Sequence, residues 1–263
     1  PVNDDCANAT VIGALPYNSG TLSNNCATND IPAGSGCGSF SSNVWYRVTG
    51  TGQPMSASTV NAGTNFDTEI HVYSGSCGSF TEVGCNDDYS GLQSLVNWCS
   101  SSGATYYISV GNYGTTSGFG NYQLTVNNNP ISVTVNSPSV CNGTNATVTA
   151  TPNPAGSYTY AWSVPGGASN PGNVSSFTTG VAGTYTVTIT NGSGCTSSSS
   201  GTVTVNSNPT VTVNSPSVCS GNNATITATP NPAGSYTYAW TVPGGASNPG
   251  NVYSFTTNVA GTY

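Results

Sequence analysis

The chain carries an internal repeat, and this repeat constrains the fold more than any other feature of the sequence. Residues 131–185 and 209–263 align without gaps at an offset of 78, and 47 of the 55 aligned positions are identical. Near-identical units in tandem are typical of domain arrays. Because this period is longer than that of helical solenoids, we expect each unit to be a small domain of its own.

Both copies alternate small polar and apolar residues, which indicates β-strands. In the first copy the alternating runs are residues 146–150, 158–162, 184–190 and 201–205. Clusters of Gly, Pro and Asn separate them at spacings typical of a sandwich, and the Thr/Val richness disfavours helix. The sequence therefore predicts an Ig-like β-sandwich over 130–207 and a second over 208–263 that lacks its last strands.

The first part of the chain differs from the repeats but also reads as β. Alternating runs occupy residues 44–48, 69–73, 105–110 and 122–126, and Asn127–Pro130 has the composition of a linker. We expect a jelly-roll-like β-sandwich over 1–129. The whole chain is thus predicted to be all-β, a jelly-roll-like sandwich followed by tandem Ig-like sandwiches.

Charged residues are only 3% of the chain, and all of them lie at or before Asp88. Arg47 is the one basic residue and His71 the one histidine. A chain so poor in cations cannot neutralise phosphates, which excludes nucleic-acid binding. No apolar run approaches the roughly 18 residues that span a membrane, so no membrane insertion is expected. The neutral repeat surface has little self-repulsion and favours self-association into filaments, or contact with other surface proteins and glycans.

Nine cysteines without a CxxC pair favour disulfides over zinc, and therefore an oxidising extracellular compartment. A short hairpin predicts the pair Cys77–Cys85, and the first repeat can close Cys141–Cys195 within itself. Four more cysteines can pair in three ways. These four are Cys6, Cys26, Cys37 and Cys99.

The second repeat has only Cys219, whose partner by the repeat period would lie near position 273. We expect that the natural protein continues beyond Tyr263 and that a leader preceded Pro1. A strand supplied by a neighbouring subunit is the rival explanation for the odd cysteine.

Five oxygen-bearing side chains flank the predicted Cys77–Cys85 hairpin and are of the type that calcium prefers. Turn formation is the alternative explanation, because Asn-Asp-Asp is a good turn former. The predicted calcium ligands are Asp67, Glu69, Asn86, Asp87 and Asp88.

Aromatic residues suggest two further sites. Trp162 and Trp240 occupy the core-strand position of an Ig-like sandwich, so we expect core packing rather than a sugar platform. Four aromatics in or near loops of the first domain are candidates for a glycan- or partner-binding surface. They are Tyr89, Trp98, Tyr113 and Phe119.

No catalytic residues are predicted. His71 would need a nucleophile and an orienting acid, and no GxSxG elbow is present. Asp67 and Asp87 could form a glycosidase acid pair, but the domain is too small to build a cleft around them. We expect a non-enzyme in which His71 is structural.

The first domain resembles a module of secreted bacterial proteins akin to pre-peptidase C-terminal domains. The matching motifs are NDDCANA (3–9), VWY (44–46), FDT (66–68), VYSGSCG (72–78), CNDD (85–88) and YYISVG (106–111). The resemblance implies the pair Cys6–Cys37, which leaves Cys26–Cys99, and it is compatible with calcium as a cofactor.

The repeats resemble the Ig-like or PKD-like modules of bacterial surface adhesins. The features that carry this resemblance are SVC (139–141), YAW (160–162), GTYTV (183–187) and GC (194–195). Such adhesins are often exported by type IX secretion, and the family implies attachment or spacing rather than catalysis.

We therefore expect a non-catalytic extracellular protein, a stalk or filament subunit of the bacterial cell surface. The alternative is a glycan- or polymer-binding accessory region of a larger secreted enzyme. Ice or mineral binding ranks last, because strict short Thr repeats are missing.

Overall fold

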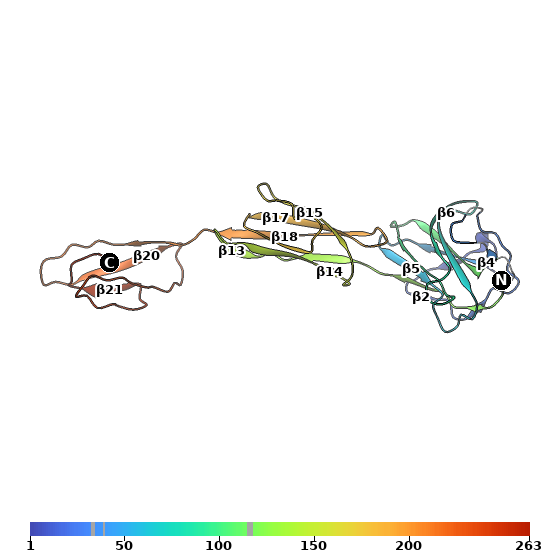
Figure 1. Cartoon of the computed structure of the whole chain (residues 1–263), viewed down its shortest axis with the longest axis horizontal. Coiled ribbons are helices and arrows are strands. Elements are labelled where there is room, and N and C mark those ends of the chain that lie inside the picture. Colours follow the sequence, from blue (N-terminus) through green and yellow to red (C-terminus); the bar gives the residue numbers. More distant parts are fainter. Residues whose placement is uncertain (33–34, 39, 115–117) are drawn as a thin grey trace. The chain divides into compact units, whose positions relative to one another are not determined.

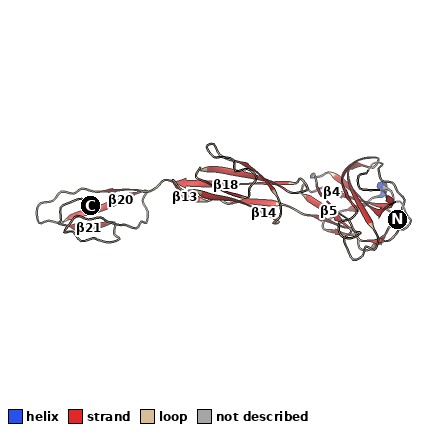
Figure 2. Cartoon of the chain, in the orientation of Figure 1, coloured by secondary structure: helices blue, strands red, loops and turns tan. Residues whose placement is uncertain are grey.

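The computed structural model of the chain describes residues 1–32, 35–38, 40–114 and 118–263 (Figure 1). Figure 2 shows strands throughout, and the one helical element of the described residues is the 3-10 turn η1 (Cys6–Asn8). The all-β prediction is confirmed. No helix in the described part is long and apolar enough to cross a membrane.

The N-terminal region contains two main sheets and a two-stranded one. The first sheet has the order β1 (Thr10–Ile12), β4 (Phe40–Thr49), β9 (Thr105–Tyr113), β6 (Thr68–Ser76), β7 (Ser79–Asn86). The second has the order β2 (Tyr17–Asn18), β11 (Thr125–Asn128), β5 (Pro54–Ser58), β8 (Leu95–Cys99). The small sheet joins β10 (Asn121–Tyr122) to β3 (Leu22–Ser23). Only β1 pairs in parallel, with β4; the other pairs among these strands are antiparallel.

One apolar core lies between the two main sheets, because alternate residues of their strands point the same way. It combines Tyr46 of β4 with Met55 of β5 and Ile108 of β9, all fully buried. The outer face of the five-stranded sheet holds a second cluster, in which the ring of Trp45 stacks on Phe80 at 5.3 Å. The N-terminal sandwich therefore buries both faces of that sheet.

The predicted strand 122–126 is divided between two sheets. Tyr122 of β10 pairs with Leu22, whereas Val126 of β11 pairs with Tyr17 and Ala57. The chain changes sheets at this point, so one alternating run serves two strands.

The first repeat is a two-sheet sandwich. One sheet has the order β12 (Ser132–Val135), β14 (Ala146–Asn153), β16 (Ser176–Thr179). The other has the order β13 (Ser139–Cys141), β18 (Thr196–Asn206), β17 (Gly183–Thr190), β15 (Thr159–Ser163). Trp162 lies 5.0 Å from Phe177 in the core, which confirms the packing predicted for this tryptophan.

Strand β18 is longer than the predicted run 201–205, because the serines before it also pair with β17. Hydroxyl groups form cross-strand hydrogen bonds between Thr186 and Ser200 and between Thr188 and Ser198, each at 2.8 Å. A serine run without apolar residues thus still forms a strand, through side-chain pairing on its exposed face.

The second repeat contains only the first of these two sheets, with the order β19 (Thr210–Val213), β20 (Ala224–Asn231), β21 (Ser254–Thr257). Segments 217–219 and 237–241 match β13 and β15 in sequence but are not strands. In the first repeat β13 pairs with β18, and β15 pairs with β17. Segments 217–219 and 237–241 lack those partners.

By spatial clustering the chain forms two compact units. One comprises residues 1–138 with 146–203, and the other comprises residues 139–145 with 204–263. The N-terminal sandwich and most of the first repeat belong to the first unit.

Candidate functional sites

A buried cluster of one histidine and two glutamates lies on the outer face of the N-terminal sheet. Glu69 and His71 are two residues apart on β6 and therefore face the same way. The His71 ring is fully buried, with Nε2 2.7 Å from Glu69 Oε1 and Nδ1 2.5 Å from Glu82 Oε1. A β-bulge after Val72 shifts the register and places Glu82 of β7 opposite Tyr73. Both ring nitrogens therefore face carboxyl oxygens, and protons must lie between them to satisfy both contacts.

This cluster binds the segment around Gly36 and Cys37, which precedes β4, to strand β7 of the sheet. The backbone N–H of Gly36 donates to Glu82 Oε2 at 2.7 Å, and the neighbouring Cys37 is bonded to Cys85 of β7. The His71 ring also stacks on Tyr73, with centroids 5.8 Å apart. These contacts hold the His71 ring in place, and its structural role stays a prediction.

The part of the chain that the structure describes holds one group of three side chains with metal-ligating atoms within 4.8 Å of one another, namely His71, Glu82 and Cys85. Cys85 is bonded to Cys37, so its sulfur is not a thiolate. This group does not form a metal site in the oxidised protein.

The predicted calcium ligands are divided between several roles. Asn86 Oδ1 accepts a hydrogen bond from the Leu95 N–H at 3.0 Å, and Asp87 Oδ1 accepts one from the Asp88 N–H at 2.8 Å. The Asn86 contact joins the end of β7 to the start of β8, the Asp87 contact lies in the segment after β7, and Glu69 holds His71.

Asp67 nevertheless lies in a negative environment. Burial raises the pKa of its carboxyl group, and the carboxylates of Asp88, Asp87 and Glu69 raise it further. Asp67 Oδ1 and Glu69 Oε2 are buried without a hydrogen-bond partner. Calcium binding by this set stays a prediction.

The four candidate binding aromatics do not share one environment. Tyr89, Tyr113 and Phe119 are 62%, 45% and 45% exposed, as a binding surface requires. Trp98 is 2% exposed and packs in the core, 5.9 Å from the ring of Tyr106. The prediction that Trp98 belongs to a binding surface is wrong, because β8 turns this residue toward the facing sheet.

The disulfides differ from the predicted pairs. The structure contains Cys6–Cys77, Cys37–Cys85 and Cys99–Cys195, and it leaves three exposed free cysteines. The free ones are Cys26, Cys141 and Cys219. Six of the eight cysteines predicted to form disulfides do so, but none with the predicted partner.

Strand geometry explains the error at Cys77–Cys85. Cys77 lies in the tight turn between β6 and β7, where Ser76 pairs with Ser79. Cys85 is paired with His71 further along the hairpin, roughly 20 Å from the turn at the rise of an extended strand. The turn cysteine instead reaches Cys6 of η1.

The predicted pair Cys141–Cys195 fails for a similar reason. Cys141 of β13 pairs with Asn206 at the end of β18, whereas Cys195 directly precedes the first residue of that strand. The 11 residues of β18 separate the two cysteines. Cys195 therefore bonds to Cys99 of the N-terminal sandwich, which also rules out the predicted pair Cys26–Cys99. The predicted pair Cys6–Cys37 is wrong as well, since both cysteines bond to the β6–β7 hairpin.

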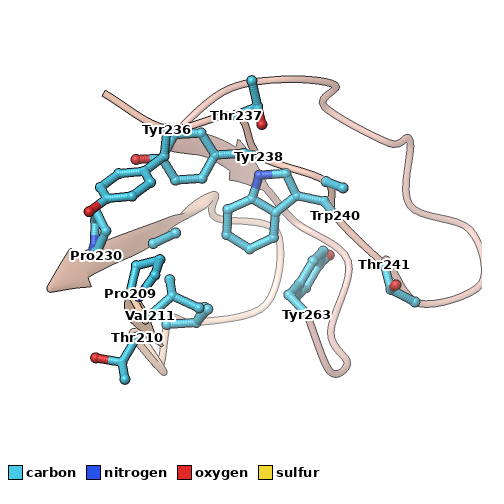
Figure 3. A pocket seen from close by; sticks show the side chains of 13 residues that line it. Pro209, Thr210, Val211, Pro230, Tyr236, Thr237, Tyr238, Trp240, Thr241 and Tyr263 are labelled. Atoms are coloured by element: carbon cyan, nitrogen blue, oxygen red, sulfur yellow. The ribbon is translucent and has the colours of Figure 1, made fainter. Parts of the chain in front are cut away.

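The second repeat has an aromatic groove that the sequence reading did not identify. Its volume is about 440 Å³, and its lining includes Val211, Tyr238, Trp240 and Tyr263 (Figure 3). Val211 is 59% exposed, whereas the matching Val133 of the first repeat is 6% exposed. The sequence holds one signal for this groove, because residues 209–263 contain no counterpart of residues 186–206 of the first repeat.

No protein-family model and no curated protein matches the chain. Partly similar solved structures are β-sandwich modules. The PKD domain (329–428) of human KIAA0319 is 18% identical with a TM-score of 0.25, covering 29% of this chain and 81% of that one. The N-terminal eight Ig domains of DSCAM isoform 1.30.30 are 16% identical with a TM-score of 0.26, covering 69% and 29%. The N-terminal four Ig domains of Dscam1 isoform 9.44, crystallised with zinc, are 18% identical with a TM-score of 0.25, covering 65% and 43%. The chain spans less than half of either Ig-domain chain. TM-scores this low carry no inference about fold or activity.

Proposed function

We propose that the chain is a non-catalytic structural and adhesive protein of the bacterial cell surface. In this proposal the N-terminal sandwich is the head of a stalk and the Ig-like repeats are its shaft. The observation that carries the proposal is the disulfide between Cys99 of the sandwich and Cys195 of the first repeat. A covalent bond between successive modules resists their separation, which suits a protein that transmits tension.

The chemistry of the chain supports an extracellular location for this stalk. Three disulfides persist best in an oxidising compartment. The repeats carry no ionisable side chain other than tyrosine and cysteine. Their surfaces can approach one another without charge repulsion, which supports self-association into filaments that is insensitive to salt.

Single-molecule pulling tests the load-bearing role. The chain is held at its two ends and extended under oxidising and then reducing conditions. With Cys99–Cys195 intact, the 96-residue loop between these cysteines cannot lengthen. The double variant Cys99→Ser/Cys195→Ser keeps Cys6–Cys77 and Cys37–Cys85, so under oxidising conditions its contour length should exceed that of the native chain by about 30 nm. After reduction the two chains should have the same contour length, and equal lengths under oxidising conditions would contradict the proposal.

A glycan- or polymer-binding head is the second candidate, supported by the exposure of Tyr89, Tyr113 and Phe119. Exposed aromatic rings stack on sugar rings, and their loss should weaken binding on a glycan array. Tyr89→Ala tests this role, and Val11→Ala is a matched control at another exposed apolar residue. An unchanged array profile in variants of all three aromatics would contradict it.

A further inference from the structure

The disulfide Cys37–Cys85 lies beside two other side chains that can bind a metal ion. His71 of β6 and Cys85 of β7 are directly opposite each other in the antiparallel ladder, which places their Cβ atoms about 5 Å apart. A ring nitrogen of His71, a carboxylate oxygen of Glu82 and the sulfur of Cys85 all lie within 4.8 Å of one another. Because Cys37 is bonded to Cys85, its sulfur lies at the same place. One nitrogen, one oxygen and two sulfur atoms are thus brought together.

This set of atoms matches what zinc binds in proteins. Zinc is held tetrahedrally by cysteine sulfur at about 2.3 Å and by histidine nitrogen or carboxylate oxygen at about 2.0–2.2 Å, so neighbouring ligand atoms are about 3.3–3.8 Å apart. His71 Nδ1 and Glu82 Oε1 are 2.5 Å apart in the oxidised chain, and they must separate by roughly 1 Å to admit the ion. The Glu82 side chain is 25% exposed, which leaves it room for this shift.

The disulfide is what prevents metal binding in the oxidised chain. Zinc is bound by thiolates, and a disulfide contains none. A small dithiol can open Cys37–Cys85 by giving up two electrons and two protons, so that the dithiol becomes a cyclic disulfide and two cysteine thiols form. Zinc then displaces the protons of both thiols and the proton between His71 and Glu82.

Glu69 gives a second, independent reason to assign a metal to this cluster. A metal-binding histidine generally donates its other ring N–H to a carboxylate, which fixes the ring orientation and makes the ligand nitrogen more basic. His71 Nε2 lies 2.7 Å from Glu69 Oε1, and both side chains are fully buried. This contact leaves Nδ1 on the side of Glu82. Glu69 is therefore a positioning residue and not a ligand.

We propose that this cluster is a zinc site when the Cys37–Cys85 disulfide is open. Its ligands are Cys37, Cys85, His71 and Glu82. The ion would then hold the segment around Gly36 and Cys37 to β7, as the disulfide does in the oxidised chain. The ligands come from separate segments of the sequence, so no short motif marks them. This inference goes beyond the stalk proposal and does not depend on it.

The test uses the full chain, reduced with a dithiol that is then removed without oxygen. Cobalt(II) is the probe, because a tetrahedral cobalt ion bound by thiolates shows a sulfur-to-metal charge-transfer band and intense visible bands. The reduced native chain should show these bands, and added zinc should abolish them by competition for the same ligands. The oxidised native chain should show none. A reduced, folded native chain without these bands would overturn the proposal.

Three variants identify the ligands. Cys37→Ser/Cys85→Ser should lose the bands, whereas the matched control Cys6→Ser/Cys77→Ser removes the other disulfide of the same hairpin and should keep them. Glu69→Gln should weaken cobalt binding by about 10- to 100-fold, as loss of a carboxylate behind a ligating histidine does. Equal bands in both double variants would show that cobalt binds to other cysteines and would overturn the site.

Circular dichroism checks whether the reduced chain keeps its β-sheets. If it does not, Cys37→Ser without any reductant decides the question. This variant keeps the other two disulfides and offers His71, Glu82 and the Cys85 thiol in the folded chain. It should bind cobalt with the charge-transfer band of one thiolate, and Cys37→Ser/Cys85→Ser should not. Absence of the band from Cys37→Ser would overturn the proposal.

Discussion

Cys99 and Cys195 have Cα atoms 5.1 Å apart although 96 residues separate them in the sequence, and they join two successive modules. Cys99 ends β8 of the N-terminal sandwich, and Cys195 stands just before β18 of the first repeat. The first repeat therefore uses its cysteine for a bond between modules, not for the internal bond expected of an Ig-like domain.

Thiol labelling distinguishes the observed disulfide pairs from those predicted from the sequence. With bonds as observed, three exposed thiols remain, namely Cys26, Cys141 and Cys219. Native, unreduced protein should take up three alkyl groups by mass spectrometry, and one peptide should contain Cys99 bonded to Cys195. Uptake of a single group, at Cys219 alone, would contradict the observed pairs and agree with those predicted from the sequence.

The sequence predicts the strands well because alternation is a local property. The runs at 44–48, 69–73 and 184–190 all lie within observed strands. Disulfide partners depend on strand register and on contacts between modules, which no local pattern records. Cys77 illustrates this, since one tight turn decides that it cannot reach Cys85.

Among the candidate site residues, too, the sequence predicts the strand of a residue but not its partner across the sheet. The sequence predicts His71 in a strand, and the structure places it in β6. Its partner Glu82 could not be predicted, because the bulge after Val72 sets the register that brings the two together. Trp98 was misassigned because it lies on the inward face of a short strand next to loops.

Removal of the His71 ring should destabilise the N-terminal sandwich. In His71→Ala the buried carboxylate of Glu69 loses the ring nitrogen that lies 2.7 Å from its Oε1 and remains in the protein interior. Breaking a buried charged pair in this way costs about 3–5 kcal/mol. The measurement is the free energy of unfolding from urea titration.

Two comparisons make the His71 result specific. Arg47→Ala, at an exposed position, should change the unfolding free energy by no more than about 0.5 kcal/mol. His71→Leu/Glu69→Leu removes both groups and should recover much of the loss, because no uncompensated charge stays buried. A cost below about 1 kcal/mol for His71→Ala would show that the cluster is not a buried ion pair.

Asp67 should be a source of instability at neutral pH. Because burial and three neighbouring carboxylates raise its pKa, the folded state binds the proton more tightly than the unfolded state. Stability is therefore lost as the pH rises from the ordinary carboxyl pKa of about 3.9 through the raised value. Asp67→Asn should raise the Tm by about 1–3 °C at about pH 7, and this gain should vanish at about pH 3. An unchanged Tm at both pH values would contradict the argument.

Calcium provides a separate test at the same residue. If the predicted set binds calcium, about 5 mM calcium should raise the Tm of the native chain but not that of Asp67→Asn. Magnesium at equal concentration is the control for ionic strength, because it demands a tighter octahedral site. No Tm increase with calcium would show that the acids form a turn only, while the effect of Asp67→Asn at neutral pH would still stand.

Cys141, the free cysteine of the first repeat, should form a disulfide with a matching cysteine when the second repeat is extended. Cys141 pairs with Asn206 at the end of β18 that leads into the second repeat, so it stands at that module junction, as Cys99 does at the previous one. In a variant that carries the sequence of Thr186–Asn206 after Tyr263 with its cysteine kept, the appended cysteine occupies the position equivalent to Cys195. If the bond between modules is repeated one module further along the chain, the appended cysteine should form a disulfide with Cys141, as Cys195 does with Cys99. Peptide mapping without reduction should find this link and a loss of thiol labelling at Cys141, with labelling at Cys26 unchanged as the control. A link to Cys219 instead would show that a repeat closes its own disulfide, and that the bond between modules is confined to the N-terminal junction.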